Sequence, residues 1–227
     1  MALLVGDEVS ATSFGTVRHL LEKNYKIPFT ILLIDMLGRA KLSDFGAIVL
    51  PDGFGYDGAI GKETIARLRE WVAAGGNLIA MGNAAFWATA DRSGLSRIKA
   101  SKPADPTDSK KADAKNESRP TRYVPAEQRE ASARRTGNPG AILRLELDPA
   151  SSVVYGCGGR SPFVLASNEQ GFDPDSGQVA ALYTLDPKAS GFVGADAAKR
   201  LAGQAFAITE RPGRGRIVLF PKTPFPD

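Results

Sequence analysis

The sequence predicts an α/β protein whose first half forms a parallel sheet and whose second half is richer in strands. Up to about residue 90, short apolar runs alternate with segments of helical periodicity, which is typical of βαβ units. From residue 141 onward, strand-like runs follow one another with one short helical segment between them. At 227 residues and 43% hydrophobic composition, the chain can bury a sizeable core as one domain, residues 1–227, with an insertion.

The first half contains four candidate strands and two candidate helices. The strands are residues 2–6, 29–34, 47–50 and 77–81, and the helices are residues 14–23 and 61–74. Ser10, Thr12 and Ser13 are helix-capping residues before the first helix, and Gly75-Gly76 can end the second. Because the strand runs are apolar without interruption, we expect each strand to be covered on both faces.

The character of the chain changes between about residues 95 and 136. This segment has four prolines, many charged and small residues, one aromatic residue (Tyr123) and no apolar periodicity. It predicts a long polar insertion that is flexible or that folds against a partner. Residues 95–135 carry 11 Lys and Arg against 6 Asp and Glu, whereas the rest of the chain is close to neutral.

That basic segment is where a polyanion could bind. Specific nucleic-acid recognition needs arginines placed at base edges or aromatic rings that stack on bases, and one tyrosine among mixed charges is a poor match. We therefore expect a solvated loop and no nucleic-acid partner, with weak salt-dependent polyanion binding as an alternative.

The second half predicts several strands and a terminal hairpin. Candidate strands are residues 141–147, 163–166, 179–185, 205–210 and 216–220, with a short helix at 195–203. The last two runs are joined through Arg211-Pro212-Gly213, a turn signal that predicts a β-hairpin.

The most informative feature is the strand-to-helix turn at residues 78–87. An apolar strand ends in Gly82-Asn83-Ala84 and leads into an aromatic-containing helix, which is the shape of a nucleophile elbow. These three residues offer neither a thiol nor a hydroxyl. The chain has one histidine, His19, and one cysteine, Cys157, far from the turn in sequence. A non-catalytic cysteine and a surface histidine are favoured over a catalytic pair.

The sequence is a poor match to zinc sites and to glycine-rich phosphate-binding loops. Common catalytic zinc sites need two or three histidines with a carboxylate, and one histidine cannot supply them. The glycines at 53, 55, 58 and 61 precede a helix but match neither the P-loop nor the dinucleotide fingerprint. The carboxylates Asp7, Glu8 and Asp52 leave a hydrolase that uses crevice carboxylates or hydroxyls as an alternative.

The polar residues that follow neighbouring strands define a candidate ligand crevice. In parallel sheets, ligands bind beyond the carboxyl ends of the strands. If the first, third and fourth strands are neighbours, Asp7, Asp52 with Gly53, and Asn83 gather at one edge of the sheet. No signal peptide or membrane span is expected, and a single cysteine leaves the compartment open.

Several motifs together resemble a class I glutamine-amidotransferase-like domain, of the kind found after bacterial M14-type zinc carboxypeptidase domains. They are Val5-Gly6-Asp7, residues 13–21, residues 48–53, residues 71–76, Ala84-Ala85-Phe86-Trp87, Ser190-Gly191-Phe192, Leu201-Ala202-Gly203 and residues 213–220. The resemblance covers nearly all of the chain except the insertion. It implies a flavodoxin-like three-layer sandwich with a mostly parallel central sheet.

The resemblance implies a fold without the family's catalytic residues. A working amidotransferase would place a cysteine at the elbow and a histidine with a glutamate on a later loop, and no histidine follows His19. We therefore expect a catalytically inactive accessory domain that binds a small ligand, a peptide or another protein. We expect it to have no cofactor of its own. The resemblance assigns zinc and peptidase chemistry to an upstream domain, and leaves a secreted or periplasmic location open.

Overall fold

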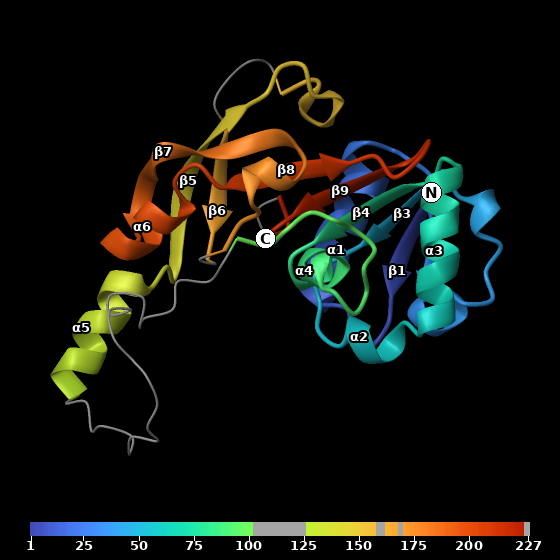
Figure 1. Cartoon of the computed structure of the whole chain (residues 1–227), viewed down its shortest axis with the longest axis horizontal. Helices are drawn as coiled ribbons and strands as arrows, with labels where there is room; N and C mark the ends of the chain where they lie inside the picture. Colours follow the sequence, from blue (N-terminus) through green and yellow to red (C-terminus); the bar gives the residue numbers. More distant parts are fainter. Residues whose placement is uncertain (102–125, 158–161, 168–169, 225–227) are drawn as a thin grey trace, which may run out of the picture.

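The computed structural model describes residues 1–101, 126–157, 162–167 and 170–224. Its strands form one mixed sheet in the order β2-β1-β3-β4-β9-β8-β7-β5-β6 (Figure 1). The strands are β1 (Ala2–Val5), β2 (Thr30–Leu33), β3 (Ala47–Leu50), β4 (Asn77–Met81), β5 (Gly140–Leu147), β6 (Phe163–Ala166), β7 (Gln178–Phe192), β8 (Ala205–Glu210) and β9 (Arg216–Phe220). The helices are α1 (Ala11–His19), α2 (Tyr56–Ala59), α3 (Lys62–Ala74), α4 (Asn83–Thr89), α5 (Ala126–Thr136) and α6 (Ala195–Leu201).

The sheet has a parallel half and an antiparallel half. β2, β1, β3, β4 and β9 pair in parallel, whereas β9, β8, β7, β5 and β6 pair antiparallel. The α/β class is confirmed, but the expectation of a mostly parallel sheet is wrong. Strand-like patterning in the second half did not reveal strand direction. The predicted hairpin between β8 and β9 is confirmed.

Helices cover both faces of the parallel half. On one face, Phe14, Val17 and Leu21 pack against side chains of β1, β3 and β4. On the other face, α2, α3 and α4 bury their apolar side chains against the alternate residues of the same strands. This alternation explains why β1 and β3 are apolar at every position.

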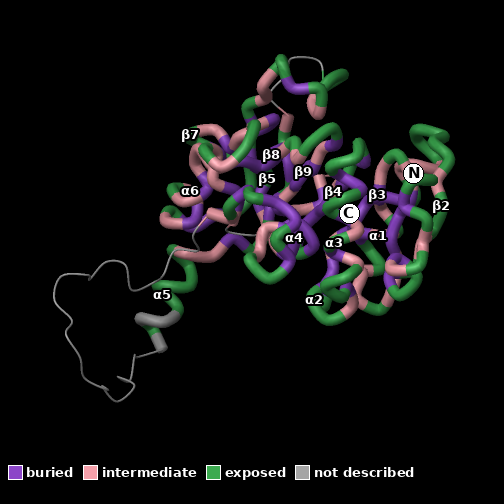
Figure 2. The backbone as a smooth tube through the Cα atoms, turned by 45° about the vertical axis from the view of Figure 1, so that its right-hand side comes forward, coloured by how far each residue is buried: buried purple, intermediate pink, exposed green. Residues whose placement is uncertain are grey.

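The edge strand β2 departs from the expected two-sided burial. Ile31 is 49% exposed and Leu33 is 51% exposed, and Figure 2 shows β2 at the rim of the molecule. Both side chains lie on the face covered by α1, because Ile31 is paired with Leu3 in the parallel register. An apolar run alone does not distinguish a central strand from an edge strand.

Residues at both ends of the predicted insertion have defined structure. Leu95 and Ile98 are buried in the core of the parallel half, and Ala100 forms an isolated bridge with Phe172. Residues 126–136 form α5, a helix without an apolar periodicity in its sequence. The expectation of flexibility falls mainly on residues 102–125, which lie outside the described residues.

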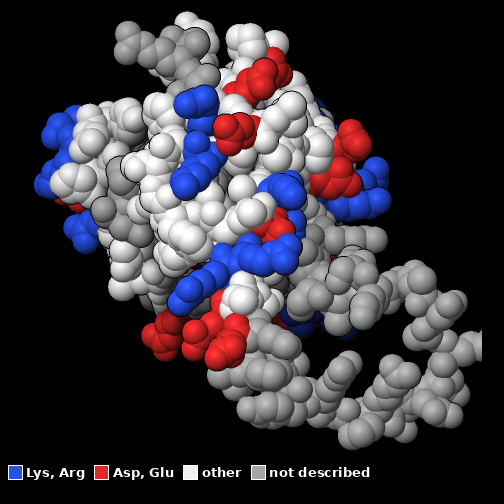
Figure 3. All heavy atoms as spheres, turned by 90° about the vertical axis from the view of Figure 1, so that its left-hand side faces the viewer, with Lys and Arg blue, Asp and Glu red and all other residues white. Residues whose placement is uncertain are grey.

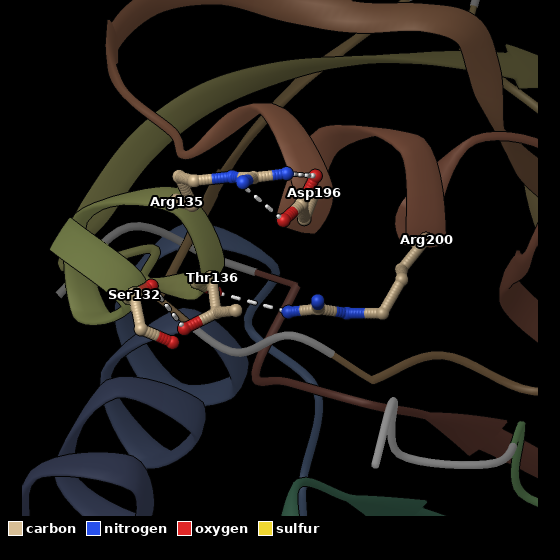
Figure 4. A network of polar contacts seen from close by, with 5 residues as sticks. All are labelled: Ser132, Arg135, Thr136, Asp196 and Arg200. Carbon is tan, nitrogen blue, oxygen red and sulfur yellow. Dashed lines mark hydrogen bonds and ion pairs between the residues drawn. The ribbon is translucent and has the colours of Figure 1, made fainter. Parts of the chain in front are cut away.

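A polar network holds α5 against α6 (Figure 4). The Arg135 guanidinium forms an ion pair with Asp196 at 3.2 Å. An Arg200 N–H donates to the Thr136 carbonyl at 2.9 Å. The Gly194 N–H donates to the Gly137 carbonyl just beyond α5. Side-chain charges and the helix end, rather than an apolar stripe, therefore position α5.

Two buried tyrosines, Tyr56 and Tyr183, have phenol groups that resist ionisation in the folded state. Burial raises the pKa of Tyr183, and burial together with the Asp52 and Glu8 charges raises the pKa of Tyr56. The folded state therefore binds these phenol protons more tightly than the unfolded state, so their contribution to stability is complete below about pH 10 and is lost above it.

We expect two of the five tyrosines to ionise only as the protein unfolds at high pH. Ultraviolet absorbance of phenolate, recorded together with circular dichroism during an alkaline titration, checks this. The replacements Tyr56→Phe and Tyr183→Phe should each remove part of the late absorbance change. Ionisation of both phenols before any loss of structure would contradict the prediction.

Candidate functional site

The turn between β4 and α4 is the centre of the candidate site. β4 runs into α4 through Gly82, whose backbone has φ 57° and ψ −132°. The Gly82 N–H donates to the Phe220 carbonyl at 2.9 Å, which attaches the turn to the end of β9. This backbone conformation disfavours residues with a Cβ. Gly82 is therefore the strained residue of the elbow, and it carries no reactive side chain.

The carboxylate of Asp52 occupies the space where a side chain at position 82 would lie. A Cβ built on Gly82 falls well inside van der Waals contact with Asp52 Cγ and Oδ1. Asp52 Oδ1 accepts hydrogen bonds from the Asn83 N–H at 2.7 Å, from Asn83 Nδ2 at 3.0 Å and from the Gly53 N–H at 2.8 Å. An acceptor from the loop after β3 thus satisfies an amide at the start of α4.

Ser13 and Thr223 add two hydroxyl groups to the polar cluster formed by Asp52, Gly53 and Asn83. The Asp52 N–H donates to Ser13 Oγ at 3.0 Å, and Ser13 Oγ lies 3.0 Å from Thr223 Oγ1. Both hydroxyl residues are buried. From the sequence, Ser13 was expected only as a capping residue, and Thr223 was not expected at the site. Nothing in the sequence signalled a contact between residues 210 positions apart.

Three of the four predicted crevice residues share hydrogen bonds, and Asp7 does not take part in them. Asp52, Gly53 and Asn83 share the hydrogen bonds described above, because β1, β3 and β4 are neighbours as expected. Asp7 instead lines a hollow of about 290 Å³ with Glu8 and Asp35 at the carboxyl ends of β1 and β2. Among the described residues, no hydrogen bond joins Asp7 to Asp52 or Asn83.

The backbone of the loop that follows β1 packs tightly on Gly53. Val9 and Gly53 form an isolated antiparallel bridge, and the Phe54 N–H donates to the Glu8 carbonyl at 2.7 Å. A Cβ on Gly53 would overlap the Glu8 carbonyl oxygen. The role of Gly53 in this structure is therefore to let two loops meet.

In the part of the chain that the structure describes, no hydrogen bond joins the two remaining catalytic candidates, His19 and Cys157. His19 is exposed at the end of α1, and Cys157 is a free, exposed cysteine in the loop after residues 152–154. Within the described part of the chain, no three His, Cys, Asp or Glu side chains are grouped so that they could hold a metal ion. The same part of the chain contains no helix long and apolar enough to span a membrane.

Comparisons with known proteins support the α/β class with a large mixed sheet. No family model matches the chain, and no curated protein matches it. Similar solved structures include a cytoplasmic protein, STM1381, from Salmonella typhimurium LT2, with a TM-score of 0.54, 12% identity, and coverage of 100% of this chain and 90% of that one. A ThuA-like protein from Bacteroides uniformis has a TM-score of 0.51, 10% identity, and coverage of 98% and 81%.

A longer enzyme is also similar over part of its length. Gan42B, a GH42 β-galactosidase from G. stearothermophilus, has a TM-score of 0.45 and 14% identity over 96% of this chain. This chain spans about a quarter of that protein, 26% of its length. At these identities the similarities with TM-scores above 0.5 concern the fold alone.

The replacement Gly82→Ala tests the packing of the elbow. Both the backbone conformation and the overlap with Asp52 oppose a Cβ, so we expect the free energy of unfolding to fall by about 2–4 kcal/mol. Denaturant unfolding measures the change. Gly58→Ala is the matched control, because its Cβ meets nothing within 4 Å. Equal effects of the two replacements would contradict the prediction.

The replacement Asp52→Ala tests the carboxylate as an acceptor. It removes the partner of the Asn83 and Gly53 amides, and we expect a loss of about 1–2 kcal/mol of unfolding free energy. Asp52→Asn keeps an oxygen acceptor and should lose less. Because Asn83 is exposed, water can replace part of the lost interaction. An Asn variant less stable than the Ala variant would argue against this role.

Proposed function

We propose that this chain is a catalytically inactive glutamine-amidotransferase-like domain that acts as an accessory or binding module. The observation that carries the proposal is the elbow itself, where Gly82 holds the strained position and Asp52 fills the space of a nucleophile's side chain. A thiol at this position would require the carboxylate to move. The arrangement presents hydrogen-bonding groups and neither a thiol nor a hydroxyl at the elbow.

A flavodoxin-like, three-layer parallel half is part of the proposal. The strand order β2-β1-β3-β4 and the helices on both faces support it. The similarity to a ThuA-like protein also supports it, since ThuA-like proteins are glutamine-amidotransferase-like. Because one fold hosts many functions, the proposed inactivity rests on the elbow at Gly82 and not on this similarity.

The binding role is assigned to the edge formed by Asp52, Gly53 and Asn83. Asn83 is exposed and Asp52 is partly exposed, so a small ligand or a peptide segment can reach their polar atoms. Asp52 Oδ1 already accepts three N–H groups. The groups left to a ligand are the second carboxylate oxygen and the Asn83 carboxamide oxygen, which favour a ligand with N–H or O–H donors.

We expect no glutamine hydrolysis by this domain. Ammonia release from L-glutamine should equal the uncatalysed background for the wild-type chain, because no thiolate and imidazole pair is assembled. Asp52→Ala and Asn83→Ala, each checked for folding by circular dichroism, should give the same background. Hydrolysis that both replacements abolish would favour the alternative, a hydrolase that uses crevice carboxylates or hydroxyls.

The partner in this proposal is an upstream M14-type zinc carboxypeptidase domain, with zinc held there. The sequence of the native reading frame tests this point. We expect it to encode an upstream domain with histidine and glutamate zinc ligands, and zinc content measured on the full product should then be close to stoichiometric. A reading frame without such a domain would remove this partner from the proposal and leave the inactive elbow unaffected.

Polyanion binding has no specific observation in its favour. Most of the basic segment lies outside the described residues, and Figure 3 shows Lys and Arg interspersed with Asp and Glu on the face of the antiparallel half. We expect little retention of the chain on heparin at about 0.15 M salt. Strong retention that is lost when residues 102–125 are deleted would instead support polyanion binding.

A further inference from the structure

The outer edge of β2 is apolar, and no strand of the described part of the chain pairs with it. β2 ends the sheet on the parallel side, and its sequence, Thr30-Ile31-Leu32-Leu33, has no charge, proline or glycine. Natural edge strands are usually protected by such residues or by a covering element. Ile31 and Leu33 are half exposed, and Ile27 and Met36, also exposed, flank the strand at its two ends.

Among the described residues, the backbone groups on the outer side of β2 have no strand partner and form a matched set. The Thr30 N–H donates to the Met1 carbonyl, toward the neighbouring strand. Because backbone groups alternate along a strand, the N–H and C=O groups of Ile31 and Leu33 point outward. Two outward residues separated by one inward residue form an antiparallel pair with a second copy of themselves, with Ile31 of each copy opposite Leu33 of the other.

The same register places the exposed side chains together. Ile31 and Leu33 lie on one face of the sheet. In this register Ile31 of one copy would face Leu33 of the other on that face, and the two Leu32 residues would face each other at the centre of the pair. Directly opposite apolar residues in antiparallel strands stabilise one another. A strand that satisfies both its backbone and its side chains in one register favours pairing with itself.

Charges at the two ends of β2 have opposite signs. At its amino end, a basic hollow of about 500 Å³ is lined by Arg18, Glu22 and Lys26, together with apolar residues. Glu22 forms an ion pair with Arg18 at 3.2 Å, which leaves Lys26 in excess. At the carboxyl end of β2, an acidic hollow of about 290 Å³ is lined by Asp7, Glu8 and Asp35.

We propose that β2 is an interface through which two copies of this chain associate, antiparallel, about a two-fold axis at Leu32. This arrangement continues the sheet from one copy into the other and places the basic hollow of each copy beside the acidic hollow of its partner. A two-fold interface needs a surface that is complementary to itself, and opposite charges at the two ends of one strand provide that complementarity and set the antiparallel direction.

The opposite edge of the sheet provides a matched control. β6 also exposes apolar side chains, with Phe163 58% and Leu165 45% exposed. There the Arg144 guanidinium lies 5.9 Å from the centre of the Phe163 ring. Leu33 at the β2 edge and Leu165 at the β6 edge are both leucines, and their exposed fractions are similar, 51% and 45%. They are matched positions at the two edges of the same sheet.

Sedimentation equilibrium of the full chain over a range of concentrations tests the interface. We expect a monomer–dimer equilibrium in which Leu33→Lys raises the dissociation constant at least tenfold and Leu165→Lys leaves it unchanged. Circular dichroism and melting curves check that both variants are folded. A chain that stays monomeric at its highest soluble concentration, or a dimer that is lost with Leu165→Lys instead, would overturn the proposal.

A charge exchange tests the direction of pairing independently of the apolar contacts. Lys26→Glu and Asp35→Lys should each weaken the dimer several-fold, because each places like charges together at both ends of the interface. The double variant, which exchanges the two charges, should recover most of the wild-type affinity. A double variant no tighter than the single ones would overturn the antiparallel arrangement. Raising the salt concentration should reduce the difference between the single variants and the wild type.

Discussion

The contact between the Asp52 carboxylate and the elbow at Gly82 is the constraint on which the candidate site depends. It needs glycine at the strained position, because any Cβ there overlaps the carboxylate. It also links three elements, since Asp52 follows β3, Asn83 begins α4 and the Asp52 amide donates to Ser13 in α1. The Asp52 carboxylate, which orders this edge of the sheet, also occupies the space where the side chain of a nucleophile would lie.

The parallel half of the sheet makes that contact geometrically available. In neighbouring parallel strands, the carboxyl ends meet at one edge, so the loops after β1, β3 and β4 converge there. The antiparallel half does not contribute an equivalent edge. It supports the end of β9, whose Phe220 carbonyl accepts from Gly82, and so the strand-rich second half helps to hold the elbow without adding a reactive group to it.

The sequence predicted most elements but not how they sit in the sheet. Periodicity located α3, and its predicted apolar face, Ile65, Leu68, Trp71 and Val72, is buried. It did not predict α5, because ion pairs and helix-end contacts rather than an apolar stripe hold that helix. For the site, the neighbouring strands brought Asp52 and Asn83 into hydrogen-bonding contact. Asp7 instead lines the hollow beside Glu8 and Asp35, because a loop's direction depends on its packing and not on where its strand ends.

By itself, the sequence determined that no cysteine, serine or threonine stands at the elbow and that a single histidine is available for the whole chain, since these are facts of composition. It also determined where apolar runs begin and end. Only the tertiary structure decided that the Asp52 carboxylate fills the vacant position beside Gly82, and that β2 lies at an edge of the described sheet. Both depend on contacts between distant segments. The local pattern of apolar and polar residues in a strand determines neither its direction nor its neighbours in the sheet.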